Sequence, residues 1–129
     1  MKPEELIKKA EEGFNLSRSP YSLQKVGAAV FTESGKVFLA ANIEVSSYSL
    51  TICAERLAVF KSILEGEKPV SIAVVAEGKK TFPPCGACLQ VISEFAPQAE
   101  VVFYYQGELK VVKVKDLIPF PFVFKKDEP

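Results

Sequence analysis

Apolar residues recur at regular spacings along the chain, and the spacing changes from helical to strand-like and back. Over about residues 3–15 the spacing is three or four positions between charged residues, which predicts an amphipathic helix. Its apolar positions are Leu6, Ile7, Ala10 and Phe14. Apolar runs over 26–31 and 36–40 predict a β-hairpin, because Gly35 between them suits a tight turn.

The run of small residues Gly27-Ala28-Ala29 in the first predicted strand indicates a close approach by another group. A helix packed on that strand and a bound ligand would both explain it. Farther along, helical spacing over 51–65 ends at Gly66, a candidate C-cap. Thr51 is the candidate N-cap of this helix, which would place Cys53 in its first turn.

The last part of the chain continues the alternation. An apolar run over 71–76 is typical of a buried strand, and a helix is expected from Cys85 to about Phe95. Residues 100–105 and 109–114 predict a second hairpin, followed by a short turn at 116–119. The order α-β-β-α-β-α-β-β predicts an α/β fold, a three-layer α/β/α sandwich with a five-stranded mixed sheet. We expect residues 1–129 to form one domain.

Composition narrows the possible partners and compartments. The 129 residues carry 16 Lys and Arg against 16 Asp and Glu, so no long-range field favours a nucleic-acid partner. No apolar run approaches the roughly 20 residues of a membrane-spanning helix, so no membrane association is expected. The charged N-terminus lacks the apolar region of a signal peptide, and we expect a cytoplasmic protein with reduced thiols.

The chain has three cysteines and no histidine. Acid–base chemistry near neutral pH must therefore come from a carboxylate, a thiol, a lysine or metal-bound water. Cys85 and Cys88 are spaced C-x-x-C at one predicted helix start, and Cys53 lies at another. Helix N-termini stabilise thiolates, and three thiolates would form a tetrahedral zinc site with one open position, as catalytic sites have.

Two charged residues follow Cys53. The Glu55 carboxylate can face the same cavity and exchange protons with zinc-activated water. Three thiolates give the zinc site a net negative charge, so an Arg56 guanidinium that donates to the sulfurs would restore part of the metal's acidity. Other interpretations stay open: C-x-x-C also fits a redox pair or half of a structural site, Cys53 could be a core residue, and Glu55 and Arg56 could face solvent.

These residues resemble the small zinc-dependent cytidine deaminases of the homotetrameric, all-cysteine type. The motifs that carry the resemblance are Cys53-Ala54-Glu55 and Pro84-Cys85-Gly86-Ala87-Cys88. Similar segments elsewhere are Pro20-Tyr21-Ser22, Val26-Gly27-Ala28-Ala29, Asn42-Ile43-Glu44, Tyr48, Gln90 and Leu117-Ile118-Pro119. The resemblance implies a cytidine deaminase-like fold and Zn²⁺ as cofactor. It also implies a hydrolase of pyrimidine salvage that converts cytidine or deoxycytidine to uridine or deoxyuridine and ammonia.

The resemblance also assigns roles to residues. Glu55 would take a proton from water on the zinc, which attacks C4 of cytosine, and would then protonate N3 and the departing amine. Asn42 and Glu44 would hydrogen-bond the ribose hydroxyls, and backbone groups around Ala54 would recognise the base. The alternative for Asn42 and Glu44 is a polar strand end in solvent.

Members of this family of the all-cysteine type assemble as homotetramers, in which a C-terminal aromatic residue covers the base bound by a neighbouring subunit. Phe122 aligns best with that residue, and Phe120 and Phe124 are alternatives. A homodimer is the second expected assembly. A tail folded on its own core is also open.

Three positions depart from the family pattern. Gln24 stands where the family has Phe, Leu89 where it has Arg, and Val45 where it has Asn. An amide at position 24 could bind a different base, so a second hypothesis is a deaminase of another aminated pyrimidine nucleoside or of a blasticidin-type antibiotic. A third is a non-catalytic, zinc-structured binding protein in which Glu55 is the fourth metal ligand.

Overall fold

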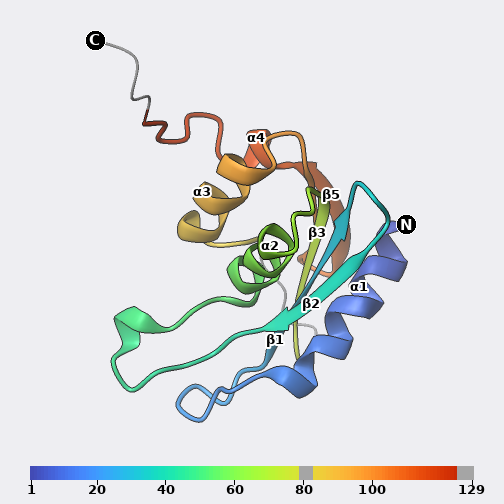
Figure 1. The fold of residues 1–129 in the computed structure, drawn as a ribbon. Helices are drawn as coiled ribbons and strands as arrows, with labels where there is room; N and C mark the ends of the chain where they lie inside the picture. The colour runs from blue at the N-terminus through green and yellow to red at the C-terminus, as the bar shows by residue number, and fades with distance from the viewer. Residues whose placement is uncertain (79–82, 125–129) are drawn as a thin grey trace.

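The computed structural model describes residues 1–78 and 83–124. Two segments lie outside the described residues: 79–82, at the start of the predicted loop before the C-x-x-C motif, and 125–129, at the end of the predicted domain. Five strands form one sheet in the order β2-β1-β3-β4-β5 (Figure 1). The strands are β1 Val26–Thr32, β2 Val37–Ala41, β3 Pro69–Ala76, β4 Glu100–Tyr105 and β5 Glu108–Lys113. The β3–β4 pair is parallel and the other neighbouring pairs are antiparallel, so the sheet is mixed, as predicted.

Helices cover both faces of the sheet. The helices are α1 Pro3–Glu12, α2 Ala54–Leu64, α3 Gly86–Phe95 and α4 Val114–Leu117, with 3₁₀ turns at Gly13–Leu16 and Tyr48–Leu50. α1 lies on one face, and α2 and α3 lie on the other (Figure 1). The predicted three-layer α/β/α fold is therefore confirmed. No helix within 1–78 or 83–124 is both long and apolar enough to cross a membrane.

Alternate residues of the central strand β1 point into two separate cores. Ala28 and Val30 pack in the layer of α2 and α3, whereas Ala29 packs in the layer of α1. A Cβ atom on Gly27 would lie 2.0 Å from the carbonyl oxygen of Ala10 in α1. Of the two interpretations of the small residues Gly27-Ala28-Ala29, a packed helix and a bound ligand, the packed helix thus explains Gly27.

Two predicted helix ends needed correction. The first helix ends at Glu12 rather than near residue 15 and continues as a 3₁₀ turn. Thr51 does not cap α2: Cys53 is its N-cap, and Thr51 has extended backbone angles. The Thr51 hydroxyl instead accepts a hydrogen bond from the Val45 N–H at 3.1 Å, so it closes the loop before the helix. Cys53 consequently precedes the first turn of α2.

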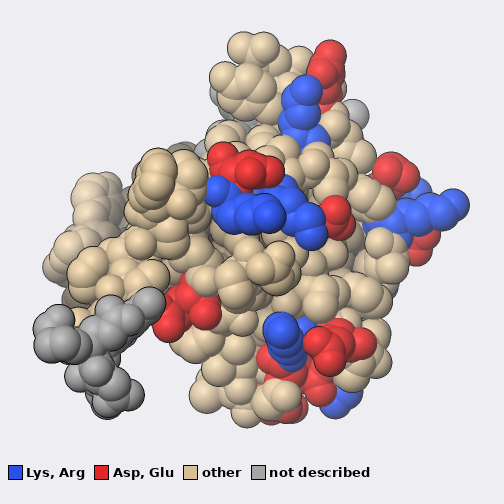
Figure 2. All heavy atoms as spheres, turned by 90° about the horizontal axis from the view of Figure 1, so that it is seen from above, with Lys and Arg blue, Asp and Glu red and all other residues tan. Residues whose placement is uncertain are grey.

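The surface carries charges of both signs. Figure 2 shows one face of the molecule, on which acidic and basic side chains lie next to one another between larger uncharged areas. Exposed ion pairs of the described residues include Lys9 with Glu12 and Lys110 with Glu108. Exposed pairs of this kind contribute little to stability, about 0–1 kcal/mol each.

Candidate active site

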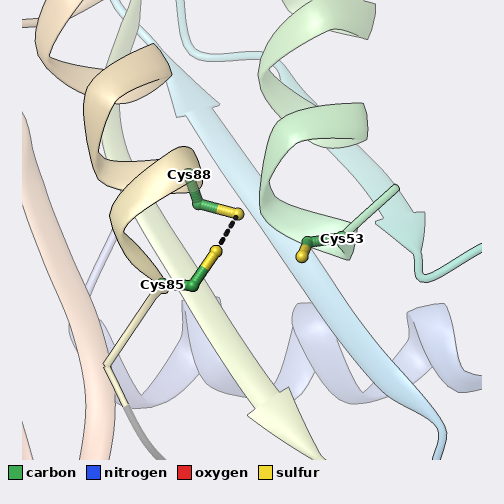
Figure 3. Close-up of side chains that lie close together, drawn as sticks. All are labelled: Cys53, Cys85 and Cys88. Atoms are coloured by element: carbon green, nitrogen blue, oxygen red, sulfur yellow. Dashed lines mark hydrogen bonds between the residues drawn. The ribbon is translucent and has the colours of Figure 1, made fainter. Parts of the chain in front are cut away.

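The starts of α2 and α3 bring the three thiols together. Cys53 is the N-cap of α2, Cys85 is the N-cap of α3, and Cys88 lies in the first turn of α3. Their sulfur atoms point toward one another (Figure 3) and all lie within 4.8 Å of each other. The Cys85 thiol donates a hydrogen bond to Cys88 Sγ at 3.5 Å.

The donor set fits zinc. A tetrahedral Zn²⁺ with Zn–S bonds of about 2.3 Å places its sulfur ligands about 3.8 Å apart, which the cluster of three sulfurs accommodates. Thiolates are soft ligands that select zinc over the alkaline-earth ions. Three ligands leave one of four tetrahedral positions to a further group. Within the described ranges this is the single group of three or more Cys, His, Asp and Glu residues close enough to hold a metal ion.

Arg56 lies against the thiol cluster. Its guanidinium donates to Cys53 Sγ at 3.6 Å, and its buried Nε has no partner among the described residues. A hydrogen bond from Cys88, and after it the contact with Arg56, lower the pKa of Cys53 to about 5. The pKa of Cys88 is raised, first because it donates to Cys53 and second because it is buried. The cluster therefore readily holds a thiolate, and Arg56 lies where a role in charge tuning requires it.

Glu55 projects into a small cavity beside the thiols. The cavity has a volume of about 150 Å³ and is lined by Val26, Asn42, Thr51, Ile52, Cys53, Ala54, Glu55 and Cys85. Glu55 is only 4% exposed. Burial is the main cause that raises the pKa of its carboxyl to about 7, and the charge of Cys53 adds to the increase. A hydrogen bond from the backbone N–H of Glu55 itself lowers the pKa and offsets part of this increase. The structure thus places a carboxyl group that titrates near neutral pH next to the thiol cluster.

The two predicted sugar-binding residues have different surroundings. Asn42 lines the cavity, whereas Glu44 does not, among the described residues. The Glu44 carboxylate accepts hydrogen bonds from the backbone N–H groups of Tyr21 and Ser22, each at 3.0 Å, and from the Ser22 hydroxyl. The Ser22 hydroxyl is the main cause of the lowered pKa of Glu44. Glu44 therefore ties the Tyr21-Ser22 turn to the segment that carries Asn42.

The chain after α4 is fastened to α3 by a contact that the sequence did not indicate. The Gln90 side chain donates to the Phe122 carbonyl at 2.7 Å and accepts from the Phe122 N–H at 3.2 Å. Phe122 is 71% exposed, and Phe120 and Phe124 are 94% and 74% exposed. Phe120, Phe122 and Phe124 thus do not pack on the core of their own chain.

The three departures from the family pattern lie outside the cavity lining. The Gln24 amide donates to the carbonyls of Lys25 and Glu77, both at 3.2 Å. Leu89 is buried in the core beneath α2 and α3, and Val45 is partly exposed. Sequence reasoning missed Val26, Thr51 and Ile52 as lining residues. Thr51 and Ile52 could have been found, because they immediately precede Cys53.

A three-layer α/β/α fold with three thiols and a buried carboxyl at two helix starts defines the class of zinc-dependent deaminase domains. The family model for the cytidine and deoxycytidylate deaminase zinc-binding region matches residues 1–105, and the chain belongs to this family. The predicted enzyme class and zinc cofactor are confirmed with it.

Individual relatives agree with this assignment. The chain is 45% identical over 120 residues to the cytidine deaminase of Halalkalibacterium halodurans, with 91% of each chain covered. It is 30% identical over 106 residues to the blasticidin-S deaminase of Bacillus cereus, covering 75% of this chain and 76% of that protein. The crystal structure of cytidine deaminase from Burkholderia pseudomallei is 42% identical, with a TM-score of 0.87, and covers 95% of this chain and 100% of its own.

Proposed function

We propose that the protein hydrolyses cytidine and deoxycytidine to uridine and deoxyuridine with release of ammonia. One observation carries the proposal: Cys53, Cys85 and the Glu55 carboxyl line one cavity at the starts of two helices. Pockets that enclose whole drug-sized ligands measure roughly 300–1,000 Å³. A cavity of about 150 Å³ suits a single small ring such as cytosine, with the sugar held outside it.

Cys53, Cys85 and Cys88 are the proposed zinc ligands. Zn²⁺ bound by them would supply a Lewis acid that makes water nucleophilic near neutral pH. Arg56 is the proposed charge-tuning residue, because its guanidinium donates to Cys53 Sγ. A donor to a coordinating sulfur withdraws electron density from it and so leaves a bound metal more acidic.

Glu55 is the proposed proton carrier. Because the chain contains no histidine, no imidazole can perform this transfer. The carboxylate of Glu55 accepts one proton from the attacking water and donates it to N3 of the ring. It then accepts the second proton from the new hydroxyl on C4 and donates it to the leaving amine. A C4–O bond forms and the C4–N bond breaks; one proton of the water ends on N3 of the product and the other leaves with ammonia, both by way of the Glu55 carboxylate. The buried position of Glu55 in the cavity wall supports this role.

Asn42 and Glu44 are the proposed ligands of the ribose hydroxyls, and the backbone around Ala54 is proposed to contact the base. Asn42 and Ala54 both line the cavity. Glu44 lies two residues beyond Asn42 in a segment without helical structure. In an extended chain, side chains two positions apart face the same side, so Glu44 can meet a sugar that projects from the cavity.

The proposed assembly is a homotetramer in which Phe122 covers the base bound by a neighbouring subunit. Three exposed phenylalanines in the tail and the Gln90 contact that holds the Phe122 backbone support this proposal. Light scattering would distinguish a tetramer from the homodimer or a monomer. We also propose that the enzyme acts in the cytoplasm and, as the family resemblance implies, in pyrimidine salvage.

Ultraviolet-monitored turnover by zinc-loaded protein tests the function. Cytidine, deoxycytidine, cytosine and blasticidin S are offered separately, and ammonia release is measured in parallel. We expect turnover of the two nucleosides. Turnover of blasticidin S alone would replace the proposal with the second candidate function, which the similarity to the Bacillus cereus enzyme favours. Full zinc content without turnover of any substrate would favour a non-catalytic, zinc-structured protein.

A further inference from the structure

The Asn42 side chain is held by three hydrogen bonds to a segment that precedes it in the chain. Its Oδ1 accepts from the Ser17 hydroxyl at 2.7 Å and from the Val26 N–H at 3.0 Å. Its Nδ2 donates to the Gln24 carbonyl at 2.9 Å. The residue is 9% exposed and lines the cavity.

These partners fix which way the amide faces. A backbone N–H can only donate and a backbone carbonyl can only accept, so a flipped Asn42 amide would oppose both Val26 and Gln24. An amide oxygen has two lone pairs, which Ser17 and Val26 occupy, and an amide nitrogen has two hydrogens, of which Gln24 takes one. Asn42 can therefore offer a ligand one N–H and no further lone pair.

The hydroxyl groups behind Asn42 are also oriented. The Ser17 hydroxyl has one hydrogen, which goes to Asn42 Oδ1, so the 3.0 Å contact between Ser17 Oγ and Ser19 Oγ is donated by Ser19. The donors then run in one direction, from Ser19 to Ser17 to Asn42. Hydrogen bonds in such a chain polarise one another, and donation to the amide oxygen strengthens the remaining N–H as a donor.

We propose that Ser17 is a positioning residue for substrate binding: it fixes and polarises the Asn42 amide so that its free N–H donates to a sugar hydroxyl oxygen. The inference rests on the proposed function, because it names the sugar as the group that Asn42 meets. The hydroxyl that accepts from Asn42 keeps its own proton. The same hydroxyl can therefore donate a hydrogen bond to Glu44, whose carboxylate can only accept.

The experiment compares two ligands of one variant. The KM of cytidine is measured together with the Ki of 2′,3′-dideoxycytidine, which has the base and the 5′ hydroxyl but lacks the 2′ and 3′ hydroxyls of the sugar. Both constants are independent of the fraction of protein that is folded and active, so a loss of stability does not alter the comparison. In Ser17→Ala we expect the KM of cytidine to rise about two- to tenfold, the size of one hydrogen bond. We expect the Ki of the dideoxy compound and the kcat to change less than about twofold.

Three further variants complete the design. Ser17→Thr keeps a hydroxyl and should restore the KM of cytidine. Ser19→Ala removes the next donor in the chain and should have a smaller effect in the same direction. Ser34→Ala is the matched control, because Ser34 lies in the β1–β2 turn and its hydroxyl donates to Glu67 rather than to Asn42.

Two results would overturn the inference in distinguishable ways. If Ser17→Ala raises the KM of cytidine and the Ki of the dideoxy compound by equal factors, or changes neither, Ser17 does not act on the sugar. If the zinc-loaded parent protein does not turn over cytidine at all, the proposed function itself fails, and the sugar role falls with it.

Discussion

The two sides of the candidate cavity are built in different ways. On the thiol side, Cys53, Glu55 and Cys85 lie within two residues of a helix start, so helix geometry sets their positions. On the side of Asn42 and Glu44, loop residues are tied by hydrogen bonds between side chains and backbone groups distant in sequence. Helix starts hold the proposed reacting groups, and tied loops orient the proposed binding groups. Changes on the thiol side should therefore lower kcat, and changes on the other side should raise KM.

Glu55→Gln should have the largest effect. It removes the proposed proton carrier but keeps the size of the side chain, so we expect kcat to fall about 10²- to 10⁴-fold at full zinc content. Turnover and zinc content are measured on the same sample, with Glu94→Gln on the exposed side of α3 as control. Loss of zinc together with activity would make Glu55 a metal ligand and would favour the non-catalytic alternative.

Arg56→Ala should have the second-largest effect on activity. Removing a charged donor from Cys53 Sγ should lower kcat about 10- to 100-fold, with zinc still bound, since the three thiols are intact. Arg18, the other arginine of the chain, is exposed and provides the matched control, Arg18→Ala. Full activity in zinc-loaded Arg56→Ala protein would show that the guanidinium does not tune the metal.

Asn42→Asp tests the other side of the cavity. The change keeps an oxygen for Ser17 and Val26 but removes both N–H donors, so the KM of cytidine should rise about tenfold or more. The kcat should change less than about threefold, in contrast to Glu55→Gln. Asn15→Asp, at an exposed position of the 3₁₀ turn, controls for the added charge. A fall in kcat without a change in KM would contradict the division between the two sides.

The smallest effect concerns pH. Hydrogen bonds from Ser22 and Tyr21 hold the pKa of Glu44 below its ordinary value of 4.5. A lowered folded-state pKa stabilises the protein above pH 4.5, and this contribution is lost as the pH falls through the folded-state value. Urea unfolding of the parent and of Glu44→Gln should differ at pH 6 and converge at acidic pH. A constant difference across this range would mean that the ionised carboxylate does not tie the turn.

The same division explains what the sequence could predict. The thiol side was readable because Cys53-Ala54-Glu55 and the C-x-x-C motif are local patterns, and because apolar spacing located both helices. The five-stranded mixed sheet was predicted from the order of the helices and strands along the chain. The N-cap of α2 is the part of the thiol side that was predicted wrongly, at Thr51 instead of Cys53. A hydroxyl just before a helix can act either as a cap or as a loop contact. The Thr51 hydroxyl makes a loop contact, because it accepts a hydrogen bond from the Val45 N–H, a partner that no local pattern identifies.

The other side of the cavity could be predicted only in part. Asn42 and Glu44 were singled out by resemblance, but nothing in the sequence identified Ser17, Ser22 and Gln24 as their hydrogen-bond partners. Hydrogen bonds between distant loops depend on how the folded backbone aligns, and serine and glutamine occur in loops for many reasons. The Gln90 contact with Phe122 was missed for the same reason, because it joins a helix to a segment without periodic structure.

The position of the thiols on two helices has a consequence for the lifetime of the protein. A metal ion held by Cys53 and Cys85 would join α2 to α3 and close the long segment between them, as a cross-link does. A ligand that binds only the folded chain raises its stability with the logarithm of the free ligand concentration. Zinc shortage would then reduce the amount of folded protein as well as its activity. The metal supply of the cell would set how long each molecule survives proteolysis.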